Sequence, residues 1–209
     1  MSPRQIASGI LLMLAWALTL AAQQPAPQPL YKFSTTVYGE PVYTFGTTVA
    51  SNGGFQGTIY YLEPGAGRLP DFSNLEPVGT IYTKYLCVPP RAFDEGFPGV
   101  TDRFEWFAID YRGRFWIAKA GTYRFALASD DGSILYIDGK KVIHNDGTHP
   151  VIEKFSKAKL TAGAHDIRVS YFQGPRFHVA LVLRVAGPGD RELRVFSTDD
   201  FKPPPDARW

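Results

Sequence analysis

The sequence predicts an all-β fold, a sandwich or barrel of antiparallel strands. Apolar side chains alternate with other types in several segments, most clearly in 121–129, where Tyr123, Phe125 and Leu127 share one face. Turns that contain glycine and aspartate separate these segments at short intervals, and no segment shows a long helical stripe of apolar residues. Short strands with this spacing are typical of sandwiches and barrels.

The first predicted core strands lie in residues 102–117, which read DRFEWFAIDYRGRFWI. This segment is aromatic on both faces and is interrupted by Gly113, so we expect two strands on either side of a turn. Trp106 and Trp116 lie in the most apolar part of the segment. We therefore expect both tryptophans to lie in the core rather than to bind ligand.

The strand predicted at 121–129 is followed by SILYIDGKKVI, residues 133–143. In the second segment, Asp138-Gly139 supplies the positive φ that a tight hairpin turn requires, so we expect two short strands joined there. Alternating apolar residues predict two further strands in 162–173 and 177–185.

The chain divides into four parts: a targeting segment at 1–22, a linker and N-terminal arm at 23–52, the β domain at 53–200, and a Pro-rich tail at 201–209. The arm can contribute a strand. The tail, FKPPPDARW, cannot continue a sheet because three consecutive prolines have no N–H to donate.

The N-terminal segment is typical of a secretory signal peptide. After Arg4 comes the apolar run IASGILLMLAWALTLAA, and the polar, proline-containing QQPAPQP follows it. We expect cleavage after Ala22 and export to the periplasm, the cell surface or the extracellular space. An uncleaved membrane anchor is the alternative, because about 17 residues is at the lower limit for spanning a bilayer.

The charge balance and the single cysteine argue against nucleic-acid binding and against a reactive thiol. Removal of the targeting segment takes away one basic residue of 22 and none of the 20 acidic residues, so the remaining chain is almost neutral. We therefore expect no nucleic-acid partner, and we interpret Lys154, Lys157 and Lys159 as a solvated strand face. The single cysteine, Cys87, lies in the apolar stretch YLCVPP, where a buried, unreactive thiol is expected.

The segment ASDDGSILYIDG, 128–139, places two aspartates, Asp130 and Asp131, next to each other. Adjacent carboxylates repel each other, so either water screens them at the tip of a turn or a shared cation holds them together. In the first interpretation the pair begins a turn and accepts backbone N–H bonds before Gly132. Both interpretations remain open at this point.

The ordered pattern GTYRFALASDDGSILYIDGKKVIHNDGTH, then LTAGAHDIRVSYFQGP and VALVLRV, closely resembles the PA-fourteen domain, a lectin-like β-sandwich. The resemblance covers most of the chain after the targeting segment and indicates an exported, bacterial-type protein with a single domain. The resemblance implies that, in sugar-binding members, two adjacent aspartates joined by a cis peptide hold a calcium ion and that sugar hydroxyls bind this ion directly. Asp130 and Asp131 match that pair, which makes them the predicted metal ligands.

The resemblance also implies that a later loop completes the calcium site with an asparagine. The corresponding loop here, QGPRF at 173–177, has none. Gln173 can offer a side-chain oxygen, and calcium accepts backbone carbonyls as well. Arg176, however, places a positive charge near the expected ion.

The stretch HNDGTH, residues 144–149, follows the predicted hairpin. We expect Asn145 and Asp146 to line the sugar site because the hairpin returns the chain toward the aspartate pair. A metal cluster that includes His144 and His149 is an alternative, although Asn-Asp-Gly is first a turn signal.

The sequence contains no His-Glu-x-x-His, no nucleophile elbow and no glycine-rich phosphate loop, so we do not expect an enzyme. We predict an exported carbohydrate-binding module whose cofactor is Ca²⁺ and whose ligand residues are Asp130, Asp131, Asn145, Asp146 and Gln173. The alternatives are a non-catalytic module that binds envelope or surface proteins, and an accessory subunit of a carbohydrate-active enzyme. The sequence does not identify the sugar.

Overall fold

The computed structural model describes residues 36–37, 40–41, 54–100 and 103–207. The predicted targeting segment and the linker that follows it lie outside these residues. Of the predicted N-terminal arm, the described part is one pair of short antiparallel strands, β1 (Thr36–Val37) and β2 (Glu40–Pro41). The described residues include no helix long and apolar enough to cross a membrane.

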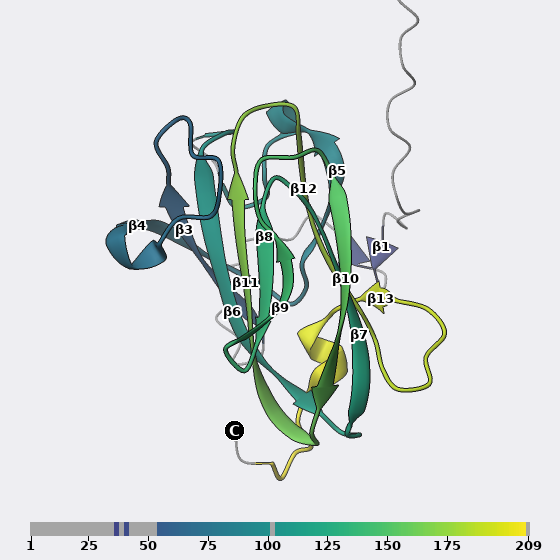
Figure 1. The fold of residues 1–209 in the computed structure, drawn as a ribbon. Coiled ribbons are helices and arrows are strands. Elements are labelled where there is room, and N and C mark those ends of the chain that lie inside the picture. Colours follow the sequence, from purple (N-terminus) through teal and green to yellow (C-terminus); the bar gives the residue numbers. More distant parts are fainter. Residues whose placement is uncertain (1–35, 38–39, 42–53, 101–102, 208–209) are drawn as a thin grey trace, which may run out of the picture. The chain divides into compact units, whose positions relative to one another are not determined.

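Two antiparallel sheets form the domain, which confirms the predicted fold class (Figure 1). The first sheet has six strands, in the order β4 (Pro77–Thr83), β3 (Phe55–Tyr61), β6 (Phe107–Ile117), β11 (Gly163–Gln173), β8 (Ser133–Ile137) and β9 (Lys140–Asn145). The second has five, with β7 (Gly121–Asp130) between β10 (Ile152–Leu160) and β12 (His178–Ala186), and with β5 (Cys87–Ala92) and β13 (Arg194–Val195) paired to β12. Short 3-10 helices lie at Phe72–Asn74 (η1), Phe93–Glu95 (η2) and Thr198–Phe201 (η3).

The core lies between the sheets and is rich in aromatic side chains. From the first sheet come Tyr111 and Tyr171, and from the second comes Phe125, all fully buried. Phe97, in the segment before β6, stacks on Tyr171 with ring centroids 5.0 Å apart. Alternation along each strand places these large residues inward, where burial of apolar area stabilises the sandwich.

A smaller apolar cluster lies outside this core. Its buried members are Leu62, Ala108 and Phe172, and the partly buried Leu69 and Phe72 of the β3–β4 connection pack against them. The connection therefore folds back over residues that neighbour the Asp130–Asp131 turn in space, since the Phe172 N–H donates to the Gly132 carbonyl at 2.9 Å.

The strands predicted at 121–129, 133–143, 162–173 and 177–185 correspond to β7, the β8–β9 hairpin, β11 and β12. The hairpin turns at the predicted dipeptide, where Asp138 and Gly139 both have positive φ, 49° and 73°.

The expected turn at Gly113 is wrong. Residues 107–117 form the single strand β6, in which Gly113 pairs with Ile167 of β11. A Cβ at Gly113 would lie 2.8 Å from the Gly54 carbonyl oxygen. This glycine permits the close approach of a neighbouring backbone rather than a reversal of the chain.

The prediction that Trp106 and Trp116 are core residues holds only in part, because both are partly buried and Trp106 packs against the smaller apolar cluster rather than in the main core. Trp106 precedes β6 and has a positive φ of 58°, so the strand begins after it. The predicted solvated face of Lys154, Lys157 and Lys159 is confirmed: all three are exposed on β10, a strand at the edge of its sheet. Lysines on an edge strand discourage pairing with a second chain.

Cys87 begins β5 and is fully buried, as expected. Burial raises the pKa of its thiol to about 12. We predict that a thiol reagent such as Ellman's reagent labels Cys87 in the native protein far more slowly than in urea-unfolded protein, because the reactive thiolate is scarce and shielded. Equal rates of labelling in the two states would contradict the packing of β5 against β12.

Candidate functional site

Asp130 ends β7 and Asp131 begins the turn into β8, and the peptide bond between them is cis. The side chains of both aspartates lie inside the protein, since Asp130 is 5% and Asp131 3% exposed. Gly132 follows because the turn packs tightly: a Cβ there would lie 2.3 Å from the Phe172 ring. The sequence thus places two buried carboxylates at the end of the second sheet.

The Asp131 carboxylate joins two loops that are distant in sequence. Its Oδ1 accepts the His149 N–H at 3.0 Å, and its Oδ2 accepts the Gly174 N–H at 2.8 Å. The loop after β9 and the loop after β11 are therefore both held against the aspartate pair. Each carboxylate oxygen has further lone pairs, so these bonds leave Asp131 able to accept a cation.

Asp130 differs from its neighbour. Within residues 54–100 and 103–207, no hydrogen bond or ion pair reaches its carboxylate, although its backbone carbonyl lies 2.7 Å from the Tyr171 hydroxyl. Burial, and then the neighbouring Asp131 charge, raise the pKa of Asp130 from 3.8 to about 7. Burial also raises the pKa of Asp131, while the N–H groups of Gly174 and His149 lower it.

The other three predicted ligand residues hold the loops around this pair. The Asn145 amide nitrogen donates to the Ser129 hydroxyl and to the Ile152 carbonyl, both at 3.0 Å. Asp146 Oδ1 accepts the Leu69 N–H at 2.8 Å, which attaches the β3–β4 connection to the turn after β9. Both residues therefore lie near the pair with contacts to other protein groups, and their role in lining a sugar site stays a prediction.

Gln173 is fully buried at the end of β11. Its Oε1 lies 2.6 Å from the Tyr171 hydroxyl, and its Nε2 donates to the His178 carbonyl at 3.0 Å. Because Tyr171 also contacts the Asp130 carbonyl, Gln173 is connected to the aspartate pair through one hydroxyl.

The surroundings of Arg176 change the electrostatic expectation for the loop at 173–177. The Glu105 carboxylate accepts the Arg176 backbone N–H at 2.9 Å and lies 3.5 Å from its guanidinium. The positive charge expected to oppose a cation is therefore partly offset by Glu105, which the sequence did not connect to this loop.

The histidine alternative has little geometric support. His144 is exposed on β9, and the His149 ring lies 2.8 Å from the Pro150 carbonyl and 3.0 Å from the Asn145 carbonyl. No group of three or more His, Cys, Asp or Glu side chains suited to a metal occurs among the described residues. Two carboxylates supply up to four oxygens, so a calcium ion at Asp130 and Asp131 needs carbonyl, water or ligand oxygens as well.

The raised pKa of Asp130 predicts an unusual pH dependence for the metal-free protein. An unfolded aspartate ionises near 3.8, whereas folded Asp130 keeps its proton up to about 7. The folded state therefore binds more protons between these values, and the stability from Asp130 is fully present below pH 3.8 and lost as the pH rises through about 7.

The measurement is urea unfolding in EDTA at several pH values, for the wild type and for Asp130→Asn. We expect the free energy of unfolding of the wild type to decline toward neutral pH relative to that of the variant. Asp71 and Asp199 have lowered pKa values, so their titration falls at more acidic pH and does not confuse the comparison. Parallel pH profiles for the two proteins would show that Asp130 ionises normally.

Comparison with solved structures supports the fold. The PA14 domain of the MpAFP antifreeze protein aligns with a TM-score of 0.60 at 20% identity, over 74% of this chain and 93% of that one. The PA14 sugar-binding domain from an RTX adhesin aligns with a TM-score of 0.57 at 18% identity, over 70% and 96%. The epithelial adhesin 9 A domain from Candida glabrata, solved in complex with Galβ1-3GlcNAc, gives 0.52 at 13% identity, over 78% and 91%.

The chain spans about half the length of the anti-sigma factor domain-containing proteins that it also matches, one of them from Clostridium clariflavum. No curated protein matches the sequence. The sequence profile of the PA14 domain matches residues 87–191, half of the chain, and this range includes the aspartate pair and both loops tied to it. The chain therefore belongs to the PA14 domain family.

Proposed function

We propose that this protein is an exported carbohydrate-binding module in which Asp130 and Asp131 hold a calcium ion and the ion holds sugar hydroxyls. The observation that carries the proposal is the buried carboxylate of Asp130, which lies beside a second carboxylate and receives no hydrogen bond or ion pair from residues 54–100 and 103–207. Two buried negative charges are costly unless a cation compensates them.

The donor set suits calcium. Carboxylates are hard oxygen ligands, and calcium accepts six to eight oxygens in a flexible arrangement. Such a site leaves coordination positions for hydroxyl groups of a ligand. Gln173, Asn145 and Asp146 support the site by fixing the loops around it.

Membership of the PA14 domain family supports a carbohydrate as the ligand. Two PA14-like structures are described as a sugar-binding domain and as an adhesin in complex with Galβ1-3GlcNAc. We transfer the general ligand class, a carbohydrate, and not the particular sugar. A binding module is favoured over an enzyme because these two structures are a sugar-binding domain and an adhesin domain.

We predict that calcium raises the melting temperature of the wild type and that EDTA reverses this rise and abolishes sugar binding. Calcium at a hundredfold excess over its dissociation constant adds about 2.7 kcal/mol to the free energy of unfolding. Asp130→Asn and Asp131→Asn should each weaken the effect, because each removes one ligand charge and keeps the side-chain shape. Differential scanning fluorimetry and a glycan array with and without calcium provide the measurements.

Asp166→Asn is the matched control, since Asp166 is an exposed aspartate near the start of β11, whereas the aspartate pair contacts the loop that follows its end. It should leave the calcium effect intact. If calcium, EDTA and both site variants leave the melting curve unchanged, the pair only forms a turn. A protein-interaction module then becomes the better interpretation.

Export is the remaining part of the proposal. We predict that the mature protein begins near Gln23, because the apolar run before it is followed at once by a polar, proline-containing segment. Intact-mass measurement of protein recovered from its native host tests this. Recovery of the chain with Met1 in a membrane fraction would indicate an anchor instead.

A further inference from the structure

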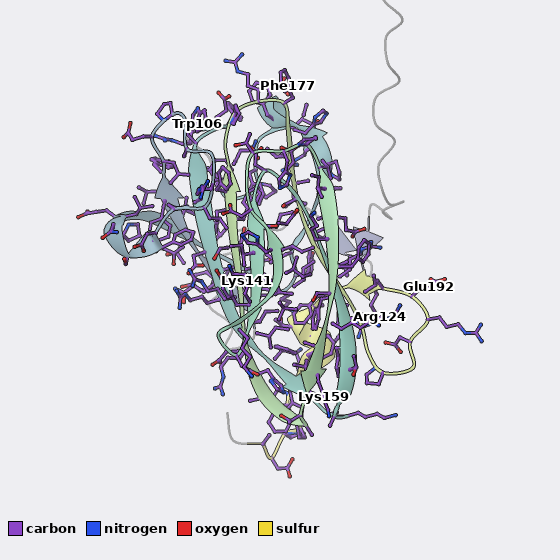
Figure 2. The ribbon with its side chains drawn as sticks, in the orientation of Figure 1. Trp106, Arg124, Lys141, Lys159, Phe177 and Glu192 are labelled. Atoms are coloured by element: carbon purple, nitrogen blue, oxygen red, sulfur yellow. The ribbon has the colours of Figure 1, made fainter. Side chains whose placement is uncertain are left out.

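The outward face of the six-stranded sheet carries a row of cationic and polar side chains that crosses four neighbouring strands. The register places Arg112 of β6 opposite Arg168 of β11, and Arg168 opposite Tyr136 of β8. Tyr136 is in turn opposite Lys141 of β9, which Figure 2 labels. Directly opposed residues of an antiparallel pair lie on the same face. The row therefore spans about 14 Å, at about 4.8 Å between neighbouring strands.

A buried carboxylate beneath this row orients both arginines. Asp110, on β6, is 3% exposed. Its Oδ1 accepts the Arg168 Nε–H at 2.6 Å and the Ser170 hydroxyl at 2.8 Å, and its Oδ2 accepts the Arg112 Nε–H at 2.8 Å. Each arginine therefore contacts Asp110 through Nε. The Nη atoms of both arginines make no hydrogen bond or ion pair elsewhere in the described part of the chain.

The two guanidinium groups are both accessible and held in place. The Arg112 side chain is 67% exposed and that of Arg168 33%. The Arg168 guanidinium lies 5.2 Å from the Tyr136 ring centroid and 5.7 Å from that of Phe72, which limits its movement. A planar guanidinium fixed through Nε still presents its Nη donors to an incoming oxyanion. Because these groups are already ordered, binding costs less side-chain entropy.

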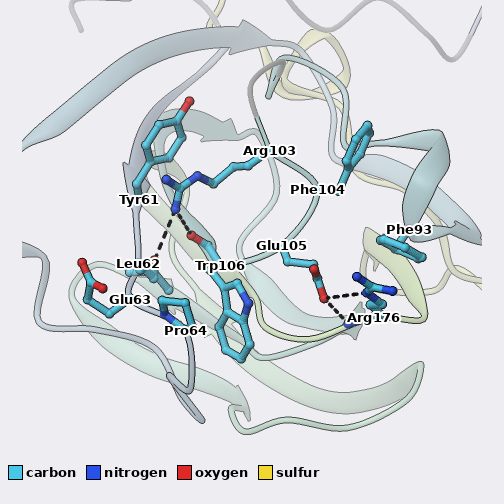
Figure 3. A pocket seen from close by; sticks show the side chains of 10 residues that line it. All are labelled: Tyr61, Leu62, Glu63, Pro64, Phe93, Arg103, Phe104, Glu105, Trp106 and Arg176. Atoms are coloured by element: carbon cyan, nitrogen blue, oxygen red, sulfur yellow. Dashed lines mark hydrogen bonds and ion pairs between the residues drawn. The ribbon is translucent and has the colours of Figure 1, made fainter.

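Two other arginines show the contrast. Arg103 and Arg176 line a cavity of about 540 Å³ (Figure 3). Nη1 of Arg103 donates to the Leu62 carbonyl at 3.3 Å and to the Trp106 carbonyl at 3.1 Å. Arg176 lies 3.5 Å from the Glu105 carboxylate. The donors of these two arginines are therefore engaged within the protein, whereas the Nη atoms of the outward row are available to a ligand.

The outward face has an excess of positive charge. The charged side chains that its six strands direct outward are four cations and two carboxylates, namely Arg112, Arg114, Arg168, Lys141, Asp110 and Asp166. Arg114 and Asp166 form an ion pair at 3.4 Å and offset each other. Asp110 offsets one charge of the row. The excess therefore lies in the row, which is complementary to an anionic ligand.

We propose that the row of Arg112, Arg168 and Lys141 binds the carboxylates of an acidic polysaccharide, a chain that contains uronic acids. Arginine forks match carboxylate geometry, and Lys141 adds a positive charge farther along the row. The exposed amide of Gln56, which is opposite Arg112, supplies a partner for sugar hydroxyls.

An extended polymer fits this row better than a folded protein does. The row contains no Leu, Ile, Val, Met or Phe side chain, whereas the centre of a protein–protein interface is apolar. The choice of a polysaccharide rests on the carbohydrate binding proposed above. The row itself includes neither Asp130 nor Asp131, so its affinity for an anion does not require calcium.

The test is isothermal titration calorimetry of the full chain in EDTA with an oligogalacturonate and with its methyl ester, which keeps the sugar rings and removes the charge. We expect the acid to bind, with an affinity that falls as sodium chloride is added, and the ester not to bind. Arg112→Gln should weaken binding about tenfold, because charge-assisted hydrogen bonds are lost. Arg112→Lys should restore only part of the loss, since lysine keeps the charge without the fork.

Lys141→Gln provides a second variant that leaves the contacts of Asp110 intact. It should weaken binding several-fold without changing the melting temperature in EDTA. Arg191→Gln is the matched control, because Arg191 is an exposed arginine in the loop between β12 and β13 and its loss changes the net charge equally. It should leave the affinity unchanged.

Three results would overturn the proposal: tight binding of the methyl ester, equal weakening by Arg191→Gln and Arg112→Gln, or equal affinity for poly-L-glutamate, which would identify an acidic peptide as the ligand. Asp130→Asn should bind the oligogalacturonate as the wild type does. Binding of oligogalacturonate in EDTA without any neutral glycan bound in calcium would support this row and contradict the calcium-bridged site. The reverse pattern would overturn the row alone.

Discussion

Burial of two neighbouring carboxylates is the constraint around which this end of the sandwich is organised. Asp131 satisfies its oxygens with one N–H from the loop after β9 and one from the loop after β11, so a single side chain sets the positions of two distant segments. Asp130 has no such partner among the described residues, and burial shifts its pKa to about 7. The Asp131 carboxylate is therefore held by hydrogen bonds, whereas the Asp130 carboxylate has no compensating group among the described residues. A cation bound between them would supply that compensation.

Much of the fold was predictable because the strands follow a local rule. Period-two alternation located β7, β11 and β12, and Asp138-Gly139 located the hairpin, since both signals depend only on neighbours in sequence. Gly113 could not be interpreted in the same way. A glycine required by the nearby Gly54 carbonyl looks the same in sequence as a glycine required by a turn.

The candidate site was only partly predictable for a related reason. The aspartate pair is a local motif, and the family resemblance predicted its role as a pair of metal ligands. The contacts that position it join residues far apart in the chain, such as Leu69 with Asp146 and Arg176 with Glu105, and no local pattern encodes them. Trp106 was assigned to the core from the apolar residues around it, whereas in the structure it has a positive φ, its carbonyl accepts the N–H of the distant Leu62, and it packs partly buried against the smaller cluster.

The β11–β12 loop is attached mainly through its backbone. Every residue type except proline carries the N–H that Arg176 donates to Glu105, and the exposed guanidinium adds an ion pair of modest strength. Phe177 is 78% exposed. Positions 176 and 177 can therefore change their side chains while the anchoring amides persist, so substitution there is compatible with the fold. A combinatorial library at these two positions would vary the side chains that this surface presents on an unchanged scaffold.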